Sequence, residues 1–93
     1  MEFSWDSRKS EANLALRGFD FAFATLVFDG PTLERVDTRE DYSEARIIAI
    51  GLAQGIPLTV VYTDRTAGGR RIISARRSNR RERDSYERAL QAR

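Results

Sequence analysis

Residues 57–76 read PLTVVYTDRTAGGRRIISAR, and this stretch decides the fold. Its first part, residues 57–64, is an alternating run rich in β-branched side chains, which predicts a strand. The pair Gly68-Gly69 then provides a turn, and residues 70–76 predict a second strand with its two isoleucines on opposite faces. Because the connection is short, the two strands are expected to be antiparallel neighbours in one sheet.

The segment before this hairpin predicts two helices. The first is expected over residues 7–17, because Asp6 is a good N-cap residue and Gly18 a good C-terminal stop. The second is a short apolar helix over residues 21–28, which we expect to be buried. Apolar residues at helical spacing predict the buried stripe of the first helix; they are Ala12, Ala15, Leu16 and Phe19.

Two further strands are expected at residues 32–38 and 45–53, and a final helix at residues 80–91. Asn79 followed by Glu82 resembles a capping box, which predicts the start of that helix. Its apolar stripe is thin and consists of Tyr86, Ala89 and Leu90. This order of elements predicts a single α+β domain over residues 1–93, with helices on one face of a four-stranded antiparallel sheet.

Charge divides the chain into two unequal parts. Residues 1–64 hold 6 basic and 11 acidic side chains, whereas residues 65–93 hold 10 basic and 3 acidic ones. This asymmetry indicates a surface for nucleic acid or for an acidic partner, although a solvated arginine-rich helix would show the same pattern. The bias toward arginine favours phosphate, which a guanidinium binds bidentately.

The residue types that are missing exclude several kinds of chemistry. The chain has no Cys and no His, so disulfides, thiolate zinc sites and a histidine base are excluded. No metal or other cofactor is expected. The apolar runs are too short for a signal peptide or a membrane span, so we expect a cytoplasmic protein without membrane contact.

Three stretches together resemble the BrnT family of type II toxins, and they span nearly the whole chain. The first stretch has the form Phe3-x-Trp5-Asp6-x-x-Lys9-x-x-x-Asn13 with Gly18-Phe19-x-Phe21, and the second is Glu44-x-Arg46-x-x-x-Ile50-Gly51. The third runs from Val60-Val61-Tyr62-Thr63 to Arg71-Ile72-Ile73-Ser74-Ala75-Arg76-Arg77, with Glu82, Arg83 and Tyr86.

The resemblance implies a RelE-like fold and a metal-independent endoribonuclease that cleaves RNA and arrests translation. It also implies neutralisation by a BrnA-type antitoxin with a ribbon-helix-helix domain, and binding of promoter DNA only through the toxin–antitoxin complex. The chain departs from the family at Leu16-Arg17-Gly18, where Lys-His-Gly is usual. Arg17 can neutralise phosphate, but it is too basic to shuttle a proton near neutral pH.

Candidate site residues follow from the needs of RNA cleavage without a metal. Stabilising the charge of the transition state is usually the largest need, and Arg46 and Arg76, at strand ends, are the candidates for it. Glu44 is a candidate base or an orienter of Arg46, and Arg17 is the fourth candidate catalytic residue. The expected RNA-binding residues are Lys9, Asn13, Arg70, Arg71, Arg77, Arg80 and Arg81, with Trp5 and Tyr86 as possible stacking platforms.

Each candidate also has a purely structural interpretation. Arg46 and Arg76 could be strand-end arginines paired with Glu44 or Asp64, and the helical spacing of Lys9, Asn13 and Arg17 could mark a solvated face. Two other functions therefore remain open. The chain could be a nucleic-acid-binding module without catalysis, or its basic segment could serve only to bind the antitoxin.

Overall fold

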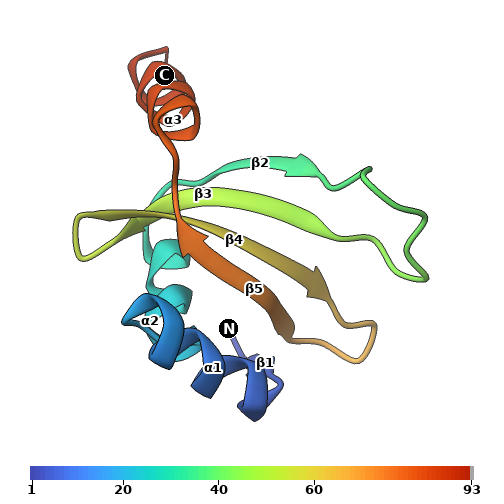
Figure 1. Cartoon of the computed structure of the whole chain (residues 1–93). Helices are drawn as coiled ribbons and strands as arrows, with labels where there is room; N and C mark the ends of the chain where they lie inside the picture. The colour runs from blue at the N-terminus through green and yellow to red at the C-terminus, as the bar shows by residue number, and fades with distance from the viewer. Residues whose placement is uncertain (93) are drawn as a thin grey trace.

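The computed structural model describes residues 1–92 and shows three helical segments, one 3₁₀ helix and five strands (Figure 1). Their order along the chain is β1 (Phe3–Trp5), α1 (Ser7–Arg17), α2 (Phe21–Ala24), the 3₁₀ helix η1 (Thr25–Asp29), β2 (Leu33–Val36), β3 (Ile47–Ala53), β4 (Ile56–Asp64), β5 (Arg70–Arg77) and α3 (Arg80–Gln91). None of the helices within residues 1–92 has both the length and the apolar character needed to cross a membrane.

The hairpin of β4 and β5 lies at the centre of the sheet, as its sequence predicts. The strand order is β1-β5-β4-β3-β2, with antiparallel pairing everywhere except between β1 and β5, which are parallel. All four predicted strands form and pair antiparallel, but a fifth strand, β1, joins them in parallel, so the predicted four-stranded antiparallel sheet of a RelE-like fold is correct only in part. A three-residue strand such as β1 is too short to be recognised from alternation alone.

Side-chain caps fix the ends of α1 and α3 where the sequence places them. Asp6 accepts the N–H of Arg8, and Gly18 ends α1 in the left-handed conformation with φ 84°. The capping box of Asn79 and Glu82 starts α3. The segment predicted as one helix over residues 21–28 is instead divided, because it tightens from the α-helix α2 into the 3₁₀ helix η1.

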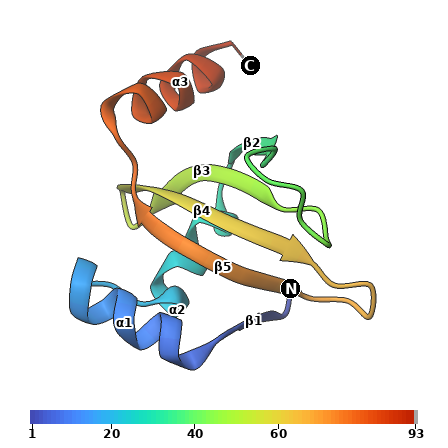
Figure 2. The same cartoon turned by 45° about the vertical axis from the view of Figure 1, so that its right-hand side comes forward.

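The core lies between the sheet and the N-terminal helices. Phe21, Ala24 and Val27 from α2 and η1 pack against inward-facing side chains of β3, β4 and β5. Both views show α3 on the opposite side of the sheet from α1 and α2 (Figures 1 and 2). The expectation that all helices cover one face is therefore wrong. Tyr86 anchors α3 there, buried and donating its hydroxyl to the carbonyl of Pro31 at 2.7 Å.

The buried face of α1 is polar, which contradicts the predicted apolar stripe. Asn13 donates to the Phe19 carbonyl at 2.9 Å, and the Ser10 hydroxyl accepts the Phe21 N–H at 3.0 Å. Leu16 remains 78% exposed. These two bonds satisfy backbone groups in the turn from α1 to α2, and such groups are costly to bury without a partner. Hydrogen bonding therefore overrides hydrophobic periodicity in orienting this helix.

Gly51 in β3 is required by close packing against η1. A Cβ atom at this position would lie 3.0 Å from Val27 Cβ and 3.2 Å from the Val27 carbonyl oxygen. We expect Gly51→Ala to lower the free energy of unfolding by about 1–3 kcal/mol through overpacking, measured by urea denaturation. Gly30→Ala is the matched control, since a Cβ there would meet nothing within 4 Å; equal losses in both variants would contradict the packing argument.

Candidate functional site

The face of the sheet turned away from α1 and α2, called here the distal face, carries the main candidate residues. Strand alternation places Arg76 of β5 on this face, together with its neighbours Thr59 in β4 and Ile50 in β3. Arg46, one residue before β3, has the same parity as Ile48 and Ile50. The distal face is thus the place where arginines from two distant segments share one surface.

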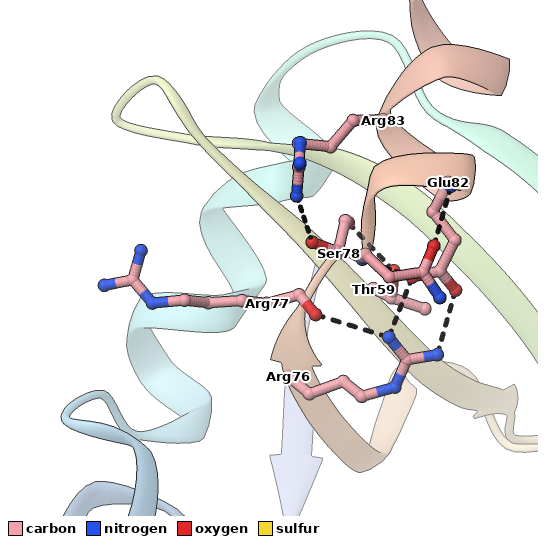
Figure 3. A network of polar contacts seen from close by, with 7 residues as sticks. Thr59, Arg76, Arg77, Ser78, Glu82 and Arg83 are labelled. Atoms are coloured by element: carbon pink, nitrogen blue, oxygen red, sulfur yellow. Dashed lines mark hydrogen bonds and ion pairs between the residues drawn. The ribbon is translucent and has the colours of Figure 1, made fainter.

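Arg76 is held by a carboxylate from the first turn of α3. Its guanidinium donates to both oxygens of Glu82, at 2.8 and 2.9 Å, in a bidentate pair (Figure 3). Glu82 also accepts the N–H of Asn79, so one side chain caps α3 and orients Arg76. The pairing with Arg76 lowers the pKa of Glu82 from its ordinary 4.5 to about 2 and raises the pKa of Arg76.

Two neighbouring contacts reinforce this network. The hydroxyls of Thr59 and Ser78 lie 2.9 Å apart, and Arg83 donates to the Ser78 carbonyl at 2.8 Å. Both contacts surround the short link between β5 and α3 (Figure 3). Arg77 extends away from the network on the other face of β5. Arg76 is therefore fixed at a rigid junction, with 43% of its side chain still exposed.

Arg46 lies at the end of the loop between β2 and β3. Its guanidinium carbon is 4.1 Å from the centre of the Tyr42 ring, and its Nε lies 4.0 Å from Glu44 Oε1. This Nε is buried and has no hydrogen-bond partner. Glu44 is in the loop and not on a strand with Arg46, because β3 begins only at Ile47. The predicted ion pair exists, but at a distance too long for a hydrogen bond.

This loop is shaped by Asp37, Arg39 and Tyr42, none of which was predicted to be a site residue. The buried carboxylate of Asp37 accepts from Arg39 Nε at 2.8 Å, from its second guanidinium nitrogen at 2.7 Å and from the Tyr42 hydroxyl at 3.2 Å. The hydrogen bond from Arg39 holds the pKa of Asp37 well below its usual range. The positive charge of Arg39 slightly opposes the rise in the pKa of Arg76. Only the Asp-x-Arg-x-x-Tyr spacing hinted at this arrangement.

The structure does not bring Arg46 and Arg76 into contact. Arg76 pairs with Thr59 of β4, whereas Arg46 immediately precedes Ile47, which pairs with Tyr62 of the same strand. The two arginines are therefore offset by four residues along the strands and lie two strands apart. Four residues along a strand correspond to roughly 13 Å, and two strand spacings to about 10 Å. Glu82 and Tyr42 hold the two guanidinium groups in separate places. One bound phosphate can therefore contact both guanidinium groups only after at least one of them leaves its present partner.

A second group of candidate residues lies between α1 and β5 and consists of Lys9, Asn13 and Arg17, with Arg76. They line a hollow of about 310 Å³ between α1 and β5, together with Ala12, Leu16, Phe21, Ile73, Ser74 and Ala75. This polar face of α1 therefore borders the same hollow as Arg76. Asn13 is buried and its amide is committed to the Phe19 carbonyl, so Lys9 and Arg17 supply the exposed charges.

Arg70 is on the opposite face from Arg76 and is part of the fold. Its guanidinium lies 3.8 Å from the Tyr62 ring centre and 4.8 Å from that of Phe28, and it forms a bidentate pair with Asp64. Only 15% of its side chain is exposed. These contacts oppose the predicted role of Arg70 in gripping RNA.

The remaining predicted RNA contacts lie on different parts of the structure. Arg71 has the parity of the distal face, while Arg77 lines an apolar hollow with Leu14 and Phe23 on the helix side. Arg80 and Arg81 are exposed at the start of α3. Trp5 packs against the core and Tyr86 is buried. Because of this burial, Tyr86 is not placed to stack on a base.

Within residues 1–92, no three Asp or Glu side chains gather in a way that could hold a metal ion. The acidic residues of the 37–44 segment include Asp37, whose carboxylate is occupied by Arg39 and Tyr42. The distal face and the loop beside it offer guanidinium groups, hydroxyls and the half-exposed carboxylate of Glu44.

The depressed pKa of Glu82 makes a prediction about acid stability. A carboxyl group whose pKa is lower in the folded state contributes stability above its unfolded pKa, and this contribution is lost as the pH falls from about 4.5 toward 2. Glu82→Gln should cost about 1–2 kcal/mol at pH 7 and flatten the pH dependence in that window. Thermal melts from pH 7 to 2 measure both effects. Asp84→Asn, which removes only an exposed 4.0 Å pair with Arg80, should change little; an equal loss there would contradict a special role of Glu82.

Comparison with known proteins places these features in a family. The family model described as "Ribonuclease toxin, BrnT, of type II toxin-antitoxin system" matches residues 5–82. The crystal structure of the Brucella abortus ribonuclease toxin BrnT is similar with a TM-score of 0.62 and 25% identity, covering 86% of this chain and 99% of that one. A comparison with curated protein sequences gives no match. The chain belongs to the BrnT family of ribonuclease toxins of type II toxin–antitoxin systems.

Proposed function

We propose that this chain is an endoribonuclease toxin that cleaves RNA without a metal ion and thereby arrests translation. Family membership supports the class of activity. The observation that carries the proposal for this chain is the pair of arginines on the distal face, Arg76 at the β5–α3 junction and Arg46 stacked on Tyr42. Arginine suits this task because its fork matches the oxygens of a phosphate.

Cleavage by the neighbouring 2′-hydroxyl needs three contributions. The hydroxyl must lose a proton, the extra charge on the phosphorus centre must be stabilised, and the departing 5′-oxygen must gain a proton. A fixed cation beside the phosphate addresses the second need, which is usually the largest. We assign this role to Arg76 and Arg46. In the absence of His, we assign the proton acceptor to Glu44, which has 48% of its side chain exposed and lies beside Arg46. The 2′-oxygen then forms its bond to phosphorus as the bond to the 5′-oxygen breaks, and the 5′-oxygen takes its proton from solvent water.

The remaining basic residues guide the strand. Arg71 extends the cationic surface on the distal face, while Arg80 and Arg81 are exposed at the start of α3. Lys9 and Arg17 lie across the hollow beside Arg76 and can hold the adjoining backbone. Arg17 then neutralises phosphate and transfers no proton, because a guanidinium does not release one near neutral pH.

The proposed partner is a BrnA-type antitoxin with a ribbon-helix-helix domain, and the proposed route to promoter DNA runs through that antitoxin. A second function deserves a test, because Arg76 already has a carboxylate partner in Glu82. An arginine that stays paired binds phosphate only weakly. In that case the chain would bind nucleic acid or the antitoxin without cleaving RNA.

Metal independence can be tested directly. Purified protein should cleave RNA equally well in EDTA and in Mg²⁺, because residues 1–92 offer no carboxylate cluster for a divalent ion. Gel analysis of product formation over a Mg²⁺ titration measures this. Activity that disappears with the chelator and returns with Mg²⁺ would show that the proposed mechanism is wrong.

The roles of the arginines can be separated by kinetics. Arg46→Ala or Arg76→Ala should lower the cleavage rate at saturating RNA by about a hundredfold, on the order of 3 kcal/mol of transition-state stabilisation. Arg80→Ala combined with Arg81→Ala should mainly weaken RNA binding and reduce its salt dependence, while saturating RNA restores most of the rate. Single-turnover rates and binding isotherms at several salt concentrations distinguish these outcomes.

Glu82→Gln is the matched control for Arg76. It removes the charge of the carboxylate that holds Arg76 but keeps the arginine itself. If Arg76 acts on the phosphate, this variant should still cleave RNA under conditions where melts show that it is folded. If the ion pair is only structural, Arg76→Ala and Glu82→Gln should lose stability and activity together. If all the arginine variants merely weaken binding and the parent cleaves nothing, the binding-module function replaces the ribonuclease.

A further inference from the structure

We propose that the hollow between α1 and β5, called here the α1–β5 groove, is a docking surface for the antitoxin. The occupant would be a segment that places an apolar side chain against Leu16 and carboxylates beside Lys9 and Arg17. The inference rests on the proposed function only for the identity of the partner. Its basis in the structure is a groove of about 310 Å³ with an apolar wall and a basic rim.

The apolar wall results from the way α1 packs. Because Ser10 and Asn13 occupy the buried position, Leu16 is turned to the side of the helix and left 78% exposed. Ala12 of α1 and Ile73 of β5 continue the same wall. An exposed leucine beside a hollow of this size offers a binding partner apolar area that folding does not use.

The rim decides which partner fits. Lys9, Arg17 and Arg76 line the groove, whereas α1 contains a single carboxylate, Glu11. A second copy of this chain would bring the same cations together, so charge disfavours a dimer through this surface. The phosphates of RNA could bind the basic rim, but the RNA backbone offers no apolar group to pack against Leu16. An antitoxin segment that combines carboxylates with an apolar anchor satisfies both parts of the surface.

The position of the groove also suggests how binding would neutralise the toxin. Arg76 contributes to the groove and, through its guanidinium, to the network with Glu82 on the distal face. A segment seated against Leu16 therefore lies next to a proposed catalytic residue. Its carboxylates would compete with RNA for the same cations, so docking and substrate exclusion occur at one place.

The test uses the full chain, with the BrnA-type antitoxin proposed above as the probe. Leu16→Asp should weaken binding of this antitoxin by about 30-fold or more, as expected for a central apolar contact, measured by isothermal titration. Its melting temperature should match that of the parent, because Leu16 is exposed and does not support the core. Hydrogen exchange of the complex should show protection at residues 9–17 and 73–76.

Leu52→Asp is the matched control, since Leu52 is an exposed leucine on β3 and does not line the groove. It should change antitoxin affinity by less than about threefold. The inference is overturned if Leu16→Asp binds the antitoxin as tightly as the parent, if it weakens RNA binding instead, or if the antitoxin does not bind at all. Loss of antitoxin binding in Leu16→Asp would support the groove even where the parent proved unable to cleave RNA.

Discussion

The carboxylate of Glu82 is the interaction on which the functional end of this molecule depends. It accepts the Asn79 N–H at the start of α3 and both guanidinium bonds from Arg76 at the end of β5. One residue therefore fixes where the last helix begins and where the main cation of the distal face is held. A charge-assisted bidentate pair is strong and directional. Together with a linker of only two residues, it makes the junction between the sheet and α3 stiff. The buried Tyr86 then needs only to hold α3 against Pro31.

The other half of the fold is organised by two polar residues in an unexpected place. Ser10 and Asn13 are buried because they satisfy backbone groups of the turn that follows α1, and a lost hydrogen bond there would cost more than an exposed methyl group. This choice turns Leu16 outward and creates the wall of the α1–β5 groove. The same packing that closes the core therefore leaves an apolar surface exposed.

Local signals in the sequence predicted those parts of the fold that depend on local physics. Helix caps at Asp6, Gly18 and Asn79 and the alternation in β4 identified their elements correctly, because each involves residues close together in the chain. Strand β1 and the side of the sheet taken by α3 depend on contacts between distant segments, which periodicity does not encode. The side of the sheet on which Arg70 lies also depends on a distant segment. Residues 70–76 predicted a strand, but the bulge opposite Val61/Tyr62 of β4 shifts the pairing along β5, so Arg70 and Arg76 lie on opposite faces.

The candidate site was harder to predict because its residues belong to loops and junctions. Arg46 and Arg76 could be named from their strand ends, yet the partners that hold them, Tyr42 and Glu82, come from a loop and a helix. These partners determine how strongly each arginine is committed to the fold. A phosphate that binds Arg76 must compete with Glu82, so it is bound less tightly than by an unpaired arginine. Because Glu82 already orients the guanidinium, binding orders little of the Arg76 side chain. Glu82 accepts the Asn79 N–H as well as the bonds from Arg76, so α3 would retain this cap when Arg76 exchanges Glu82 for a phosphate.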